Sequence, residues 1–259
     1  YEIMPSLVGS EMCIRDRDTI IGTSGDLAWS RDGKYLFYVQ RDPETLLPYK
    51  VFRHKFGEEQ SKDFLVYEEK DLTFNVSVGN SRSMDYIEID ISSTNSSETL
   101  FINSTYPTEL PKVLLPREKD HLYSVEHDED RLLILTNWEA KNFRLMYTTL
   151  AQSKDKSKWV ELIPHRKNVL LQSFLAYPSN IVLLERENGL RNLRILDRKG
   201  KSERIVGFSD PSYTTYFAAN PEYNAGKFYY GYSSMRTPDS ISVSYTHLRA
   251  HETRHDLVC

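Results

Sequence analysis

Short runs of alternating or β-branched apolar residues follow one another along most of the chain, and turn residues separate them. Five of these runs are similar: YLFYV, YIEID, LLILT, IVLLE and FYYGY, which begin at Tyr35, Tyr86, Leu132, Ile181 and Phe228. Alternation and β-branching of this kind predict strands, and no long run with a period of 3.6 residues competes with them. The pattern predicts an all-β protein.

The five runs recur at a nearly fixed interval, because their first residues are 51, 46, 49 and 47 positions apart. A shorter strand-like run and a turn precede each of them, and two further strand-like runs follow each of the first four. Units of roughly 40–50 residues that contain only strands are typical of the blades of a β-propeller. We therefore predict a partial β-propeller of about four and a half four-stranded blades.

The order of the strands within each blade follows from the chain. We expect the strands that begin LTFNV, HLYSV, QSFLA and YTTYF to be innermost, and those that begin KVLLP, KWVEL and ERIVG to be outermost. Neighbouring blades cover the faces of each sheet when they stack around an axis. An arc that does not close should therefore expose two blade faces and unpaired strand edges.

The two ends of the chain differ from the repeated region. The opening SLVGSEMCIRDR and the closing VSYTHLRAHET resemble translated sequencing-adapter sequence, and segments of this kind are excluded from fold reasoning. We expect residues 1–17 and 242–259 to be disordered, artefact-like tails without blade strands. Residues 18–241 should form the propeller, as an internal fragment of a longer protein. Both cysteines, Cys13 and Cys259, lie in the expected tails.

Two patterns suggest a metal. His247, His251 and His255 are four residues apart and would share one face of a helix, with Glu252 among them. A zinc site also needs a fixed geometry and groups that orient its ligands, and nothing before these residues prepares a helix. The stretch HDEDR, residues 127–131, lacks the mid-loop glycine and the distal glutamate of a calcium loop, so we predict a hairpin turn. The sequence therefore predicts no metal and no cofactor.

Composition argues against several classes of protein, namely nucleic-acid-binding, membrane-spanning and secreted proteins. The 259 residues include 27% charged residues and have a net charge of −4, which is typical of a soluble protein and gives no basic excess for nucleic acid. No apolar run approaches the ~20 residues of a membrane span, and the first residues lack the pattern of a signal peptide. The scarcity of cysteine favours a reducing, cytoplasmic location. We expect neither nucleic acid nor a membrane as a partner.

No catalytic residue is predicted. The G-x-S-x-G elbow of α/β-hydrolases is absent, and the nearest stretches, GTSG at 22–25 and GNSRS at 79–83, are predicted to be turns. A general base needs a nucleophile and an orienting acid within reach, and the sequence offers no such set. The histidines outside the tails should be packing or turn residues of the blades: His54, His121, His127 and His165.

Several segments are distinctive enough to name a family. PYKVFRHKFG, VYEEKD, TNWEAKNFRL, LIPHR and SSMRTP occur in this order within residues 18–241. Together with the blades around them, they resemble the propeller of the oligopeptidase B branch of the prolyl oligopeptidase family of serine peptidases. The resemblance covers nearly all of residues 18–241 without large gaps.

The resemblance implies a function as well as a fold. It implies a seven-bladed propeller that caps an α/β-hydrolase domain with a Ser-Asp-His triad, admits short flexible peptides and cleaves them after Arg or Lys. We expect this chain to be the substrate-gating propeller, inactive alone, with short peptides as partners through the missing hydrolase domain. The alternative is a non-catalytic propeller scaffold for protein–protein interaction, although the marks of WD repeats are absent.

Overall fold

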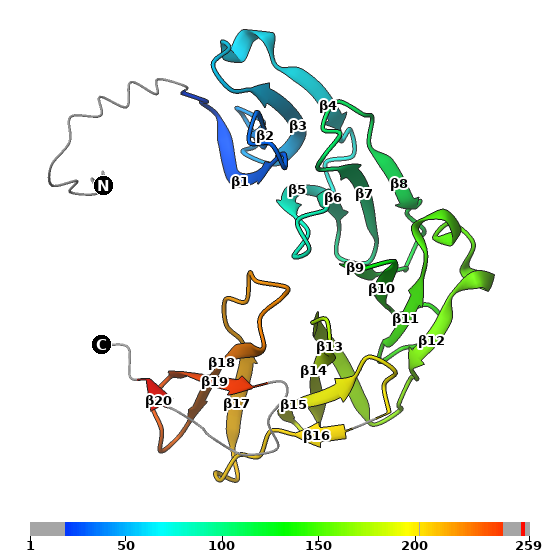
Figure 1. The fold of residues 1–259 in the computed structure, drawn as a ribbon, viewed down its shortest axis with the longest axis vertical. Coiled ribbons are helices and arrows are strands. Elements are labelled where there is room, and N and C mark those ends of the chain that lie inside the picture. The colour runs from blue at the N-terminus through cyan, green and yellow to red at the C-terminus, as the bar shows by residue number, and fades with distance from the viewer. Residues whose placement is uncertain (1–18, 202, 246–254, 257–259) are drawn as a thin grey trace, which may run out of the picture.

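The computed structural model describes residues 19–201, 203–245 and 255–256. The described residues form five antiparallel sheets of four strands each, and the chain completes one sheet before it begins the next. Figure 1 shows that the sheets follow one another around a common axis and form an open arc. The predictions of an all-β fold and of a partial β-propeller are confirmed.

Each sheet takes its strands in chain order. The first contains β1 (Thr23–Trp29), β2 (Tyr35–Arg41), β3 (Pro48–Lys55) and β4 (Phe64–Glu68). The second contains β5 (Asn75–Asn80), β6 (Tyr86–Ser92), β7 (Ser97–Asn103) and β8 (Lys112–Leu115). The third contains β9 (Tyr123–Asp128), β10 (Arg131–Thr136), β11 (Arg144–Thr148) and β12 (Val160–Ile163). The fourth contains β13 (Val169–Ala176), β14 (Asn180–Glu187), β15 (Leu190–Asp197) and β16 (Glu203–Ile205). The fifth contains β17 (Tyr213–Phe217), β18 (Lys227–Ser234), β19 (Ser240–Tyr245) and β20 (His255–Asp256).

The predicted positions of the strands agree with this order. The five similar apolar runs are β2, β6, β10, β14 and β18, the second strand of each sheet. In the second to fourth sheets, β5, β9 and β13 lie on the inner side of the arc, and β8, β12 and β16 lie on its outer rim (Figure 1). Short 3₁₀ helices occur in the connections: η1 (Gln60–Lys62), η2 (Leu150–Gln152) and η3 (Lys156–Lys158).

Apolar clusters lie between consecutive sheets and explain why second strands such as β10 and β14 have several consecutive apolar residues. On β10, Leu132 and Ile134 pack with the second sheet, whereas Leu133 and Leu135 pack with the fourth. Successive side chains of a strand point to opposite faces, so a strand with a neighbouring blade on each side buries both sets. Burial of one such side chain contributes about 1.5–3 kcal/mol.

Strand β6 is an exception, because only one of its faces is apolar. Ile87, Ile89 and Ile91 are completely buried against the first sheet. Glu88 and Asp90 alternate with them and therefore lie on the face that is turned to the third sheet. The inner part of the second sheet thus presents carboxyl groups where the other sheets present aliphatic side chains.

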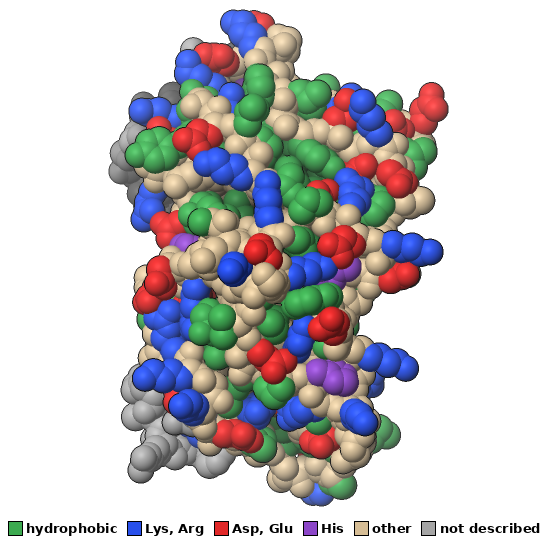
Figure 2. Space-filling model, turned by 90° about the vertical axis from the view of Figure 1, so that its right-hand side faces the viewer, with side chains coloured by type: hydrophobic (Ala, Val, Ile, Leu, Met, Phe, Trp, Pro, Cys, Tyr) green, Lys and Arg blue, Asp and Glu red, His purple; other side chains and the backbone are tan. Residues whose placement is uncertain are grey.

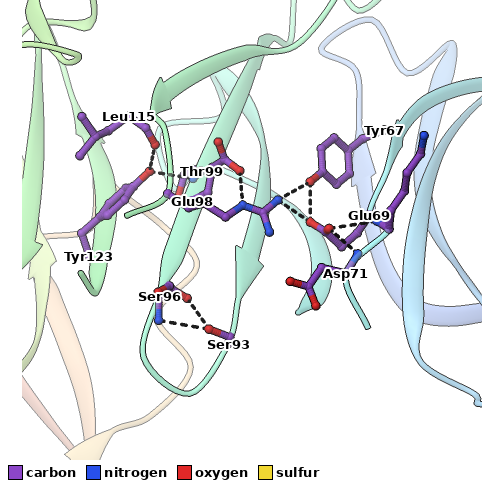
Figure 3. Close-up of polar contacts among 11 residues, drawn as sticks. Tyr67, Glu69, Asp71, Ser93, Ser96, Glu98, Thr99, Leu115 and Tyr123 are labelled. Atoms are coloured by element: carbon purple, nitrogen blue, oxygen red, sulfur yellow. Dashed lines mark hydrogen bonds and ion pairs between the residues drawn. The ribbon is translucent and has the colours of Figure 1, made fainter. Parts of the chain in front are cut away.

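Polar side chains fasten neighbouring sheets nearer the outer rim (Figure 3). Arg117, just after β8, donates to Glu69 at 2.5 Å and to Glu98 at 3.0 Å, and so joins the end of the first sheet to the second. The Tyr123 hydroxyl of β9 donates to the carbonyl of Leu115 at 2.6 Å and accepts the N–H of Thr99 at 3.0 Å. Both links satisfy polar groups that the stacking of blades removes from water.

The C-terminal boundary differs from the expectation. Strand β19 runs four residues past residue 241, and the two residues of β20 pair with Ile241 and Ser242. The alternation of serine with Ile241 and Val243 continues across the expected boundary, and Ser242 is buried, which explains why the strand does not stop there. The expected tail at residues 1–17 lies outside the described residues.

The first sheet has a face that no described strand covers. Leu27, Tyr38, Phe52 and Leu65 are register partners across its four strands and lie on this face, opposite the face that packs on the second sheet. Leu27 and Leu65 are 48% and 40% exposed, and a hollow of about 750 Å³ lies beside Tyr38 and Phe52. Apolar faces of this kind promote association.

We expect the chain to self-associate through this face. Leu27→Glu should shift it toward monomer in sedimentation velocity at micromolar concentration, because the new charge opposes apolar contact. Leu110→Glu is a matched control, since Leu110 is 69% exposed in the connection between β7 and β8, away from the open face. A monodisperse monomer formed by the unmodified chain would contradict the expectation.

Gly231 of β18 has no room for a side chain. It pairs with Tyr216 of β17, and a Cβ at Gly231 would lie 2.0 Å from Cζ of the Tyr216 ring. The ring therefore lies across the glycine, and its hydroxyl donates to the Asp239 carboxylate at 2.9 Å.

We expect Gly231→Ala to lower the free energy of unfolding by about 1–3 kcal/mol, as overpacking does. Gly79→Ala is the control in urea denaturation, because a Cβ at Gly79 meets nothing within 4 Å; an equal loss in both variants would be inconsistent with this packing.

Candidate functional site

Polar side chains from four sheets meet on the inner side of the arc. They come from the β5–β6 turn, the end of β9, the end of β13 and the long connection 218–226 between β17 and β18. Figure 1 shows that this connection projects from the fifth sheet into the space that the arc encloses. These groups therefore link four sheets from the inner side of the arc.

The β5–β6 turn has the same construction as the β1–β2 turn, which sequence reasoning missed. Both turns begin with Ser-Arg, and the hydroxyl of the serine accepts the N–H five residues later, from Tyr35 to Ser30 at 3.0 Å and from Tyr86 to Ser81 at 3.1 Å. The repeat of SRDGKY as SRSMDY was the available signal. The shared turn directs Arg31 and Arg82 from equivalent positions toward the next sheet.

Arg82 makes more contacts than its equivalent. Its Nη1 donates to the Glu126 carboxylate at 2.5 Å and to the Ala176 carbonyl at 2.7 Å. Its Nε donates to the carbonyl of Asn220 at 2.9 Å, and its Nη2 to that of Glu222 at 3.2 Å. One guanidinium from the second sheet therefore contacts the third sheet, the fourth sheet and the 218–226 connection of the fifth.

Asp128 forms a second meeting point at the end of β9. It is completely buried, and its carboxylate accepts the Tyr223 hydroxyl at 2.5 Å, Arg131 Nε at 2.8 Å and Arg198 Nη2 at 3.0 Å. Burial, together with this carboxylate, raises the pKa of Tyr223, so the phenol remains a hydrogen-bond donor. Strand β10 begins at Arg131, so the hairpin predicted for residues 127–131 is confirmed.

Three carboxyl groups lie near one another at the second and third sheets; Glu88 and Asp90 face the third sheet, whereas Glu126 lies on the face of β9 that is turned to the fourth. Glu88 and Asp90 come from β6 and Glu126 from β9. Burial raises the pKa of Glu126 to about 7, despite the adjacent Arg82. Burial and the neighbouring Asp90 and Glu126 also raise the pKa of Glu88 well above its ordinary value. At neutral pH these groups hold less negative charge than their number suggests.

His127 contacts residue types that form a catalytic triad elsewhere, but in another geometry. Its Nδ1 lies 2.8 Å from Ser83 Oγ and 3.7 Å from Asp85 Oδ2. In a Ser-His-Asp triad the serine and the aspartate bond to opposite nitrogens of the ring. Here both face Nδ1, and Ser83 Oγ also bonds Ser81 Oγ at 3.0 Å within the turn. The structure brings the three together without a proton relay.

The other three histidines are dispersed. His54 of β3 bonds Asp63 through Nδ1 at 2.8 Å, and His121 bonds Thr136 Oγ1 through Nε2 at 2.8 Å. His165 follows β12 and is half-buried. Among the described residues, no three His, Cys, Asp or Glu side chains are placed to hold a metal ion. Of the tail histidines, His247 and His251 lie outside the described residues, and the side chain of His255 in β20 is not described.

His121 and Glu126 should give the stability of the chain opposite dependences on pH. Burial lowers the pKa of His121 to about 4 from its ordinary value of 6.5. Between pH 6.5 and 4, His121 binds a proton in the unfolded chain but not in the folded chain. The stability of the fold therefore falls as pH falls through this range. His121→Gln should flatten this loss, which amounts to at most about 3 kcal/mol, in urea denaturation at successive pH values.

Glu126→Gln should remove the opposite slope. The raised pKa means that the folded chain keeps a proton between about 4.5 and 7 that the unfolded chain releases, so stability falls as pH rises through this range. The glutamine variant lacks this titration while it keeps the size of the side chain. Identical pH profiles for the two variants would contradict the assigned burial of both groups.

Comparison with known proteins identifies the family. The N-terminal β-propeller domain of prolyl oligopeptidase matches residues 14–247. The chain belongs to the prolyl oligopeptidase family. The match begins before residue 18 and ends after residue 241, the boundaries that the sequence suggested, and its end agrees with the course of β19.

Curated members of the prolyl oligopeptidase family are much longer than this chain. Dipeptidyl aminopeptidase BI of Pseudoxanthomonas mexicana is 37% identical over 222 residues, which are 85% of this chain and 30% of that protein. Protease 2 of Moraxella lacunata is 32% identical over 225 residues, which are 87% of this chain and 32% of that protein. The chain thus spans about a third of the length of these relatives.

Solved structures in the prolyl oligopeptidase family have the same arrangement of sheets. Oligopeptidase B from Leishmania major superposes with a TM-score of 0.82 at 27% identity, over 90% of this chain and 34% of that one. Oligopeptidase B from Trypanosoma brucei, in a closed form with covalently bound antipain, superposes with a TM-score of 0.83 at 25% identity, over 91% and 34%. The predicted resemblance to the oligopeptidase B propeller is confirmed.

The outer rim carries the Arg117 network, which joins two sheets, whereas the contacts on the inner side join four. Figure 2 shows the side of the molecule that carries β8 and β12, where basic and acidic side chains are interspersed without a field of one sign. Within the described residues, no helix has the length and apolar character that a membrane crossing requires. The inner side of the arc is therefore our candidate site.

Proposed function

We propose that this chain is the substrate-gating propeller of a serine oligopeptidase that cleaves short peptides after basic residues. The α/β-hydrolase domain with the catalytic serine would lie outside these 259 residues. The observation that carries the proposal is the family match over residues 14–247, within relatives of which the chain spans about a third. The match also favours a peptidase over a propeller scaffold, and the scarcity of cysteine supports a cytoplasmic location.

The proposed gate is mainly steric. The sheets are joined by apolar clusters and by polar links such as that of Arg117, so the blades are not free to separate for a folded protein. The connection 218–226 projects into the space that the arc encloses. A short flexible peptide fits such an interior at a lower cost than a folded domain, which would have to unfold first.

Electrostatic attraction contributes less to the proposed gate. Carboxyl groups along the interior would draw in cationic peptides if they were ionised. The raised pKa values of Glu88 and Glu126 reduce that charge at neutral pH, and Arg82 neutralises part of the rest. We therefore assign the preference for basic residues to the hydrolase domain and the exclusion of large substrates to the propeller.

The chain alone should hydrolyse no peptide, because it encodes no nucleophile elbow. Arg- and Lys-ester substrates should turn over only at the background rate with the purified chain. The parent protein, with its downstream domain, should cleave them and lose this activity to a serine-directed inhibitor. Turnover by the chain alone that such an inhibitor blocks would overturn the assignment.

Substrates of different size test the proposed gate. The parent protein should cleave a short peptide with one basic residue and spare a folded protein that displays the same sequence in an exposed loop. The hydrolase domain without its propeller is the comparison, and it should cleave both substrates. Equal cleavage of both substrates by the parent would contradict a gating propeller while leaving the peptidase assignment intact.

A further inference from the structure

The connection between β17 and β18 is long for a link between adjacent strands of one sheet. It spans residues 218–226, whereas only Glu129 and Asp130 separate β9 from β10. It leaves the fifth sheet and reaches residues of the second, third and fourth sheets. We propose that residues 218–226 are a strap that holds the fifth sheet to the second and third across the interior of the arc, and that Arg82 and Tyr223 fasten it.

Tyr223 anchors the middle of the strap. Its ring is 8% exposed and packs in the apolar cluster between the third and fourth sheets, with Leu133 and Phe174 among its members. Its hydroxyl reaches the buried carboxylate of Asp128 at 2.5 Å. A side chain of the fifth sheet's connection is thus built into a core that belongs to two other sheets.

Arg82 holds the strap from the second sheet. Its donors bond two carbonyl groups of the strap, those of Asn220 and Glu222, while Glu126 of the third sheet pairs with its charge. The guanidinium also lies 4.6 Å from the centre of the Tyr177 ring of the fourth sheet's turn. The planar fork of arginine supplies several donors in fixed directions, which the single ammonium of lysine does not.

The base of the strap is closed by Asn220. Its side chain accepts the N–H of Tyr229 at 2.7 Å and donates to the carbonyl groups of Ala218 and Tyr229, each at 2.8 Å. The Tyr177 hydroxyl donates to the same side chain at 3.3 Å. The strap therefore leaves the fifth sheet in a fixed direction, toward the fourth.

Arg31 is a natural control for Arg82. It occupies the same position in the equivalent turn of the first sheet, but its side chain is 57% exposed and pairs with Asp85 alone, at 2.6 Å. The Arg82 side chain is 16% exposed. The two turns share the serine bond to the N–H five residues later, and only Arg82 has partners in the strap, in addition to Glu126, Ala176 and Tyr177.

Amide hydrogen exchange of the full 259-residue chain tests the strap. Arg82→Lys keeps the charge and loses the fork, and Tyr223→Phe keeps the ring and loses the bond to Asp128. We expect each to accelerate exchange in residues 218–226 at least about tenfold, with exchange in β10 unchanged. Arg31→Lys and Tyr216→Phe should leave the strap as it is, because neither touches it.

Several results would overturn the strap. One is exchange in residues 218–226 of the unmodified chain at the rate of an unfolded peptide. Another is unchanged exchange there in both Arg82→Lys and Tyr223→Phe. A third is equal acceleration by the control variants. If Arg82→Lys unfolds the whole chain, Tyr223→Phe alone decides, since it removes a single oxygen. The measurement uses no peptide and no hydrolase domain, so its outcome is independent of the proposed function.

Discussion

The burial of both faces of each sheet by its neighbours is the constraint on which the rest of the molecule depends. A four-stranded sheet has two broad faces, and a single blade can cover neither of them. The run from Leu132 to Leu135 meets this constraint by sending alternate side chains into two different cores. The curvature of the arc follows, since consecutive sheets must stay in face-to-face contact while their inner strands converge on the axis.

Polar contacts adapt this stacking to the two edges of each sheet. Nearer the outer rim, Arg117 bonds carboxylates of the first and second sheets, and the Tyr123 hydroxyl bonds backbone groups of β7 and β8. At the inner edge, Arg82 and Asp128 collect groups from several sheets at once. The carboxyl group of Glu126 is tolerated there because Arg82 and the Ala176 N–H bond it, and burial raises the pKa of Glu88, which favours its neutral form. The inner edge is thus polar in composition and only weakly charged.

The sequence predicted the blades and not the contacts that cross the arc, and the reason is physical. Alternation and spacing are local, so the second strands could be read from runs such as YIEID and their interval. The partners of Arg82 in the strap are 138 and 140 residues away along the chain, and no sequence pattern near Arg82 predicts them. The contact of Ser83 with His127 is equally non-local. The continuation of β19 past residue 241 was in the alternation itself, which the resemblance of the tail to adapter sequence outweighed.

The strap has a consequence for the order in which the chain folds. Each sheet is made from one continuous stretch, so its strands pair over short loops, and a sheet can form soon after its residues leave the ribosome. The bonds from Arg82 to the strap close far longer loops and bring no net gain until the sheets between them are in place. We therefore expect these bonds to form last. A fifth blade made after the others finds its attachment only on a correctly stacked second, third and fourth, so the strap acts as a check on assembly.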